Sequence, residues 1–171
     1  EKIAQLVELK EKYGYEVMLD GACSPERVET LSKVGVKGFI LGTSALFGKE
    51  KSYKEIVKEL GVIADNIIFL SKHKSASEKK ALTVHPIGNW ADAKLGGKDN
   101  ELTPSSPHLM SALLRSIKKS AAHLPDYDVV FEVTHHGPLL ETPTLFMEIG
   151  STESEWSNTD ASAALASALF S

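Results

Sequence analysis

The sequence Val-Thr-His-His-Gly-Pro, Val133–Pro138, decides how the rest of the chain is interpreted. It ends an apolar run, Tyr127–Val133, that is typical of a buried strand. Adjacent side chains of a strand point to opposite faces, so a strand would give only one of the two imidazoles to a given cleft. If the strand ends near Thr134, both rings can turn toward one site. The stretch therefore predicts a strand that ends at two histidines, which are either structural or solvent-facing, or two members of one site.

Outward from this stretch, strand and helix patterns alternate along the whole chain. The predicted strands are Tyr15–Leu19, Val36–Leu41, Asn66–Leu70, Ala81–Val84, Tyr127–Val133 and Thr144–Ile149. The helix after Ser24-Pro25 has a serine cap and a proline in its first turn, and Gly35 ends it. Ser52 with Glu55 forms a capping box at the start of another helix. The alternation predicts an α/β fold, with a mainly parallel sheet and flanking helices in three layers.

Composition limits the class of protein. The 171 residues are 42% apolar and 25% charged, as in a soluble globular protein with one core or two small ones. No apolar run reaches the roughly 20 residues that cross a bilayer, so no membrane association is expected. The net charge of −4 argues against a mainly electrostatic nucleic-acid binder but allows a local basic patch. Cys23 is the single cysteine, which suits a reducing, cytoplasmic compartment and predicts a small buried thiol.

Polar clusters follow the predicted strands. They are Asp20-Gly21, Gly42-Thr43-Ser44, His85-Pro86-Ile87-Gly88-Asn89, Thr134-His135-His136-Gly137 and Gly150-Ser151-Thr152-Glu153. In open parallel sheets, ligands bind outside the carboxyl ends of the strands. The clusters therefore predict a cleft along one edge of the sheet. Residues 86–107 form a long loop beside it, of the length that is usually functional or disordered.

The histidines at this edge have two chemical interpretations. His85, His135 and His136, with Glu148 and Glu153 near the end of another strand, could hold zinc with an open position for water. They could equally act without a metal, as a general base and an oxyanion donor. The residues alone do not decide between these alternatives.

The Gly42-Thr43-Ser44 turn suits phosphate, because glycine allows close approach while backbone N–H groups and hydroxyls donate. A simple tight turn explains it equally well. Asp20 before Gly21 is either an acid/base or metal-ligating residue or an ordinary turn residue.

Residues 17–60, "VMLDGACSPERVETLSKVGVKGFILGTSALFGKEKSYKEIVKEL", resemble the last two strand–helix units of the ribulose-phosphate 3-epimerase family of (β/α)8 barrels. The resemblance implies an acid/base and metal-ligand role for Asp20. It also implies phosphate binding at Gly21, Gly42, Thr43 and Ser44. Ala22 stands where the family usually has a second glycine, and the other barrel strands are not in this sequence.

From about Asp65 to Ser171, the chain resembles the archaeal and plant type of D-aminoacyl-tRNA deacylase. The matching motifs are "LTVHPIGN" at 82–89, "EVTHHGP" at 132–138 and "MEIGSTESEW" at 147–156. The family implies an α/β core related to peptidyl-tRNA hydrolases, zinc dependence, and hydrolysis of the ester between a D-amino acid and tRNA. The catalytic residues implied are His85, Thr134, His135, His136 and Glu148, with His135 and His136 as metal ligands.

Together, the resemblances predict a segment of residues 1–60 joined to a segment of residues 61–171 by a gene fusion or an engineered chimera. The shared strand–helix pattern predicts one continuous domain with a single sheet through the junction. A Gly-Gly-x-His-Tyr motif of the deacylase family does not occur in the sequence, so impaired hydrolysis of D-aminoacyl-tRNA is expected. The alternatives are a scaffold that binds phosphate or sulfate without turnover and a purely structural chimera.

Overall fold

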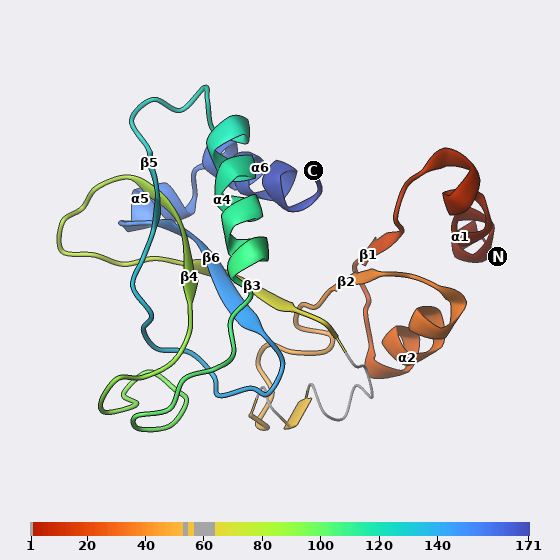
Figure 1. Cartoon of the computed structure of the whole chain (residues 1–171), viewed down its shortest axis with the longest axis horizontal. Coiled ribbons are helices and arrows are strands. Elements are labelled where there is room, and N and C mark those ends of the chain that lie inside the picture. Colours follow the sequence, from red (N-terminus) through yellow and green to blue (C-terminus); the bar gives the residue numbers. More distant parts are fainter. Residues whose placement is uncertain (1, 53–54, 57–63) are drawn as a thin grey trace. The chain divides into compact units, whose positions relative to one another are not determined.

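The computed structural model describes residues 2–52, 55–56 and 64–171, which fall into two compact units, Glu1–Ile63 and Ala64–Ser171 (Figure 1). The strands of the two units belong to separate sheets. Among the described strands, the prediction of one sheet that runs through both halves is therefore wrong, while one continuous domain stays a prediction. The predicted junction at residues 60–61 lies outside the described residues.

The first unit is a strand–helix–strand arrangement with one preceding helix. Its elements are α1 (Lys2–Tyr13), β1 (Met18–Asp20), α2 (Pro25–Val34) and β2 (Gly38–Ile40). The two strands pair in parallel, with Met18 opposite Gly38. Ser24 caps α2 by accepting from the Arg27 N–H, and Gly35 ends the helix at φ 112°. Both helix limits are as predicted, and the Ser52–Glu55 capping box is also present.

The second unit contains a four-stranded mixed sheet. Its elements are β3 (Ile67–Lys72), β4 (Ala81–Pro86), α4 (Pro107–Ser120), β5 (Asp128–Phe131), β6 (Thr144–Gly150), α5 (Glu153–Trp156) and α6 (Thr159–Leu169). The strand order is β3-β6-β4-β5, in which β3 with β6 and β4 with β5 are parallel pairs. The central pair, β4 with β6, is antiparallel. The α/β class is confirmed, but the sheet of this unit is mixed.

The antiparallel pair follows from the connections. A parallel pair needs a crossover, usually a helix, and α4 supplies one between β4 and β5. Residues 73–80 and 132–143 contain no helix, so each of these connections returns the chain in the opposite direction. The polar clusters after β4 and β6 consequently lie at opposite ends of the sheet. The prediction that Glu153 lies beside the histidines is wrong for this reason.

The two faces of this sheet differ in chemistry. One face carries Leu82, Val84, Leu145, Met147 and Ile149, and it packs against apolar residues of α4 and α6, which lie together over it (Figure 1). The opposite face carries Thr83, His85, Phe146 and Glu148, since Thr83 pairs with Glu148 and His85 with Phe146. Among the described residues of this unit, α4 and α6 share one face, so the predicted three layers are not built here.

The cap of α6 gives a stability prediction. The Asn158 Oδ1 atom accepts hydrogen bonds of 3.0 Å from the N–H groups of Asp160 and Ala161. We expect Asn158→Ala to lower the free energy of unfolding by about 1 kcal/mol, because two helix-terminal N–H groups lose their partner. Ser106→Ala is the control, since Ser106 caps α4 without a side-chain hydrogen bond. Equal losses in urea unfolding of the two variants would contradict this explanation.

Candidate functional site

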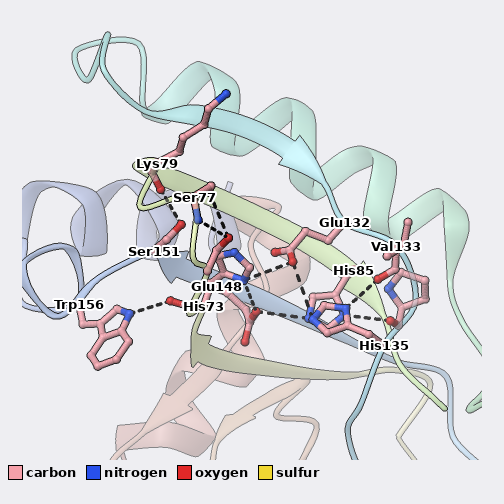
Figure 2. A network of polar contacts seen from close by, with 12 residues as sticks. His73, Ser77, Lys79, His85, Glu132, Val133, His135, Glu148, Ser151 and Trp156 are labelled. Carbon is pink, nitrogen blue, oxygen red and sulfur yellow. Dashed lines mark hydrogen bonds and ion pairs between the residues drawn. The ribbon is translucent and has the colours of Figure 1, made fainter. Parts of the chain in front are cut away.

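The polar face of the second sheet holds three histidines and two glutamates in one network (Figure 2). His85 ends β4, Glu148 lies in β6, and both side chains are almost fully buried. Glu132 and His135 follow β5, and His73 follows β3 at the other end of the sheet. The network therefore gathers residues from all four strands on the face opposite the helices.

Imidazoles and carboxylates alternate along this network. His135 Nε2 lies 3.8 Å from Glu132 Oε2, which lies 3.2 Å from His73 Nδ1. His73 Nδ1 is 3.7 Å from Glu148 Oε2, and Glu148 Oε2 is 3.4 Å from His85 Nε2. The His85 and His135 rings stack with centroids 4.1 Å apart, which closes the network. The longer distances are those of ion pairs rather than well-formed hydrogen bonds.

Backbone carbonyls fix the orientation of two of the rings. His85 Nδ1 lies 2.9 Å from the Pro86 carbonyl, and His135 Nδ1 lies 2.7 Å from the Val133 carbonyl. A carbonyl only accepts, so each Nδ1 carries the proton and each Nε2 is left toward the site. His85 also stacks on Phe146, with centroids 5.2 Å apart and planes 7° apart. This is the arrangement in which histidines commonly act as ligands or bases.

His136 completes the group of rings. It stands edge-on to His135 and His85, with centroids 4.4 Å and 5.7 Å away, and its backbone adopts φ 21°. Strand geometry would have separated the two adjacent rings, but β5 ends at Phe131. The prediction that both rings turn toward one site is confirmed. Of the other predicted residues, Thr134 takes part through its backbone carbonyl, which accepts a hydrogen bond from Trp90.

Burial and neighbouring charges shift three pKa values in this site. Burial opposes protonation of His85, but the Glu148 carboxylate and the Pro86 carbonyl outweigh it and raise the pKa of His85. Burial alone would raise the pKa of Glu148, but the polar contact with His85, the charge of His85 and the Ser71 side chain hold it below its usual range. Burial and the neighbouring His135 lower the pKa of His136. His136 is therefore neutral near pH 7, with a lone pair available.

Two groups of three residues have the donor spacing of a metal site. The donor atoms of His85, His135 and His136 lie within 4.8 Å of one another, as do those of His73, Glu132 and Glu148. His85 Nε2, Glu148 Oε2 and Glu132 Oε1 are also buried without a hydrogen-bond partner. Buried polar atoms are rarely left in this state, which fits a site built to receive a ligand.

Sequence reasoning missed His73 and Glu132 as site residues. Glu132 stands in the quoted motif, but its side chain was not assigned a role. His73 follows a predicted strand, as the assigned clusters do, so the same signal was present. Its approach to Glu148 depends on β3 lying next to β6, where Ser71 pairs with Glu148, and the sequence pattern does not reveal which strands are neighbours.

The predicted phosphate residues lie in the first unit. Because β1 and β2 are parallel and Asp20 pairs with Ile40, Gly21 and Gly42 follow the strands at the same sheet edge. The Gly42 carbonyl accepts from the N–H groups of Ala45 and Leu46, so the turn closes on itself. Cys23 is fully buried and free, as predicted.

The sequence of this chain was compared with those of known protein families. Residues 60–171 match the family model described as D-aminoacyl-tRNA deacylase. The D-aminoacyl-tRNA deacylase of Methanosarcina acetivorans is 39% identical over 153 residues, 88% of this chain and 48% of that protein. The protein of the same name from Methanosarcina mazei is 49% identical over 104 residues, 59% of this chain and 35% of that protein.

A solved structure agrees in fold. The crystal structure of a conserved protein of unknown function, AF0625, superimposes with a TM-score of 0.64 at 35% identity, over 68% of this chain and 43% of that one. This chain spans less than half the length of these curated relatives.

The M. acetivorans match covers all but about an eighth of this chain. The first unit makes up more than a third of the chain, so it cannot lie wholly outside the match. A single archaeal protein is therefore similar to the second unit and to part of the first. The family model itself covers the unit that holds the histidine network. The chain belongs to the D-aminoacyl-tRNA deacylase family.

Proposed function

We propose that the histidine–glutamate network is a hydrolytic centre for the ester that joins a D-amino acid to tRNA. The observation that supports this most is the closed network of His135, Glu132, His73, Glu148 and His85 on one sheet face, within a chain of this family. Hydrolysis needs a base for water, donors for the carbonyl oxygen, and a site that holds both in place.

The donor set fits zinc. His135 presents Nε2 with Nδ1 bound to a carbonyl, and His136 is kept neutral, which is the state that ligation requires. His135 and His136 would hold the ion, with His85 beside them, since His85 Nε2 faces the Glu148 carboxylate. Zinc, when bound, supplies a Lewis acid that polarises the ester carbonyl and lowers the pKa of water.

Glu132 and Glu148 have separate tasks in this proposal. Glu148 fixes His85, whose ring is stacked between Phe146 and His135. Glu132 Oε1 is buried without a partner, while Oε2 faces His73 and His135, so Oε1 is the atom that accepts the proton of water. The oxygen of water then bonds to the ester carbon, the bond to the ribose oxygen breaks, and the ribose oxygen takes the proton that Glu132 accepted from water.

Glu148→Gln tests the positioning role of this carboxylate. We expect hydrolysis of D-aminoacyl-tRNA to fall about 10–100-fold, because the amide keeps the shape of the side chain but loses the charge that orients His85. The pKa of His85, followed by NMR, should fall as well, since Glu148 raises it. Glu153→Gln is the matched control, because Glu153 is exposed at the other end of β6. An unchanged rate and an unchanged His85 pKa in Glu148→Gln would contradict this role.

We propose a second, separate function for the first unit, as a weak phosphate site. Gly21 and the Gly42-Thr43-Ser44 turn follow neighbouring parallel strands at one edge, which supports the epimerase-like interpretation. The similarity of the M. acetivorans protein to part of this unit favours a natural gene fusion over an engineered chimera.

Phosphate should bind at Gly42–Ser44 with millimolar affinity, because a turn with few further partners holds an anion weakly. Calorimetry with inorganic phosphate checks this, and Gly42→Val should remove the heat. The expected binding is sensitive to salt. The absence of any heat at millimolar phosphate would contradict the proposal, and so would equal heat in the variant.

A further inference from the structure

The long loop between β4 and α4 is tied to the His135-His136 segment at several points. The Gly88 N–H donates to the His136 carbonyl at 3.1 Å, and Thr103 Oγ1 donates to the Pro138 carbonyl at 2.9 Å. A Cβ atom added at Gly97 would lie 2.6 Å from the Gly137 carbonyl oxygen, so the two backbones are in close contact. The loop, residues 87–106, is therefore held against the histidine segment, and we call this loop the wall of the site.

Trp90 stands on this wall and is both anchored and exposed. Its indole N–H donates to the Thr134 carbonyl at 3.1 Å, directly before His135, yet 69% of the residue is accessible. Val133, one residue further back, is 81% exposed. Large aromatic side chains usually bury most of their area when they are held in place. Here the polar edge of the ring is satisfied and its apolar surface remains open.

We propose that Trp90 is the stacking platform for the terminal base of the RNA substrate. This inference rests on the proposed function, and the substrate's own chemistry leads to it. The scissile ester is on the terminal ribose, and the base is bonded to the same ribose. When the ester lies at His135 and His136, the base must lie one sugar away. The wall that carries Trp90 borders these histidines.

Stacking is the interaction that such an anchored ring offers. Every base has an aromatic face, and proteins that bind single-stranded ends commonly stack them on tryptophan. The Trp90 N–H is already used, so recognition through the ring face needs no new hydrogen bond. In this proposal the histidine site binds the acyl group, and Trp90 binds the terminal nucleotide.

Fluorescence and calorimetry with the trinucleotide CCA test the proposal on the whole chain. The chain has two tryptophans, Trp90 and Trp156. CCA should quench the native emission, and the quenching should vanish in Trp90→Phe, where only Trp156 emits. By calorimetry, Trp90→Ala should bind CCA roughly tenfold or more weakly, while Trp90→Phe, which keeps a ring, should bind within a few fold of the native chain.

A probe without the terminal base completes a thermodynamic cycle, in which the Trp90 ring and the base are removed separately and together. The same oligonucleotide with an abasic terminal ribose should bind the native chain as weakly as CCA binds Trp90→Ala, and Trp90→Ala should weaken it no further. The inference is overturned if native emission is unchanged at millimolar CCA, or if Trp90→Ala weakens both probes equally. It is also overturned if Trp90 proves to be covered by protein in a dimer of the chain.

Hydrolysis of a D-amino acid methyl ester, which has no base, separates this inference from the proposed function. Trp90→Ala should raise the KM for D-aminoacyl-tRNA about tenfold more than it raises the KM for the methyl ester, with any change in kcat the same for both substrates. If the chain hydrolyses the methyl ester but Trp90→Ala does not change the KM for D-aminoacyl-tRNA, the stacking role alone is contradicted. If CCA binds at Trp90 but neither ester is hydrolysed, the proposed function alone is contradicted.

Discussion

His135→Ala and His136→Ala are each expected to reduce hydrolysis of D-aminoacyl-tRNA by about 10³-fold or more, because members of a concerted catalytic set cannot replace one another. The His135 ring stacks on His85 and faces Glu132, and the His136 ring stands edge-on to both other rings. Removing either ring takes one donor from the group and opens the packing around the other two. Single-turnover release of the D-amino acid is the measurement.

His123→Ala is the control for these substitutions, since His123 is exposed and lies in the turn after α4. It should leave the rate unchanged. Circular dichroism and thermal unfolding should show that all three variants remain folded, because His135 and His136 lie outside the cluster that α4 and α6 form with the sheet. A loss of less than tenfold in both site variants would mean that the imidazoles are not central to the reaction.

Gly97→Ala is expected to lower hydrolysis by about 10²-fold although Gly97 belongs to the wall and not to the network. Its added Cβ would lie 2.6 Å from both Asn89 Nδ2 and the Gly137 carbonyl oxygen. Contacts that short force a shift, and Gly137 directly follows His136. A displacement of about 1 Å at a catalytic group can cost about 10²-fold in rate.

Gly96→Ala provides a closely matched control for Gly97→Ala. Both glycines have positive φ, 99° for Gly96 and 89° for Gly97, so both substitutions carry similar backbone strain. At Gly96, however, the added Cβ would meet the Gly137 carbonyl oxygen at 3.8 Å, an ordinary contact. Hydrolysis by Gly96→Ala should therefore remain within a few fold of native. Equal losses in the two variants would attribute the effect to strain rather than to displacement of the histidine segment.

The local parts of the site could be predicted from the sequence. A strand that ends before His135-His136, followed by Gly137-Pro138, is a short-range pattern, and the structure places both rings on one side. His85 at the end of β4 follows from the same kind of pattern. The caps of α2 at Ser24 and Gly35 also depend only on neighbouring residues.

The long-range parts could not be predicted in the same way. Every residue of β6 is buried, so its sequence shows no alternation from which its two faces could be read. Glu148 was expected near a strand end, whereas it faces Thr83 from within the strand and reaches His85 across the sheet. The contact between His85 and Glu148 depends on the antiparallel direction of β6 relative to β4, and the approach of His73 depends on β3 lying next to β6. Strand direction is set by the helix-free connections, and alternating patterns alone do not reveal it.

The structure describes no helix that is both long enough and apolar enough to cross a membrane, within residues 2–52, 55–56 and 64–171.

The resemblance of the first unit to an epimerase barrel remains a prediction, as does the assignment of Asp20 as an acid/base.

Release of the D-amino acid from charged tRNA tests the central claim most directly. The native chain, supplied with zinc, is compared with the His135→Ala, His136→Ala double variant on the same tRNA charged with D- or L-amino acid. We expect the native chain to hydrolyse the D-ester well above the spontaneous rate and the L-ester far more slowly, and the double variant to leave both at the spontaneous rate. Hydrolysis of the D-ester that is undiminished in the double variant, or a native rate equal to the spontaneous one, would contradict the claim that this network is the hydrolytic centre.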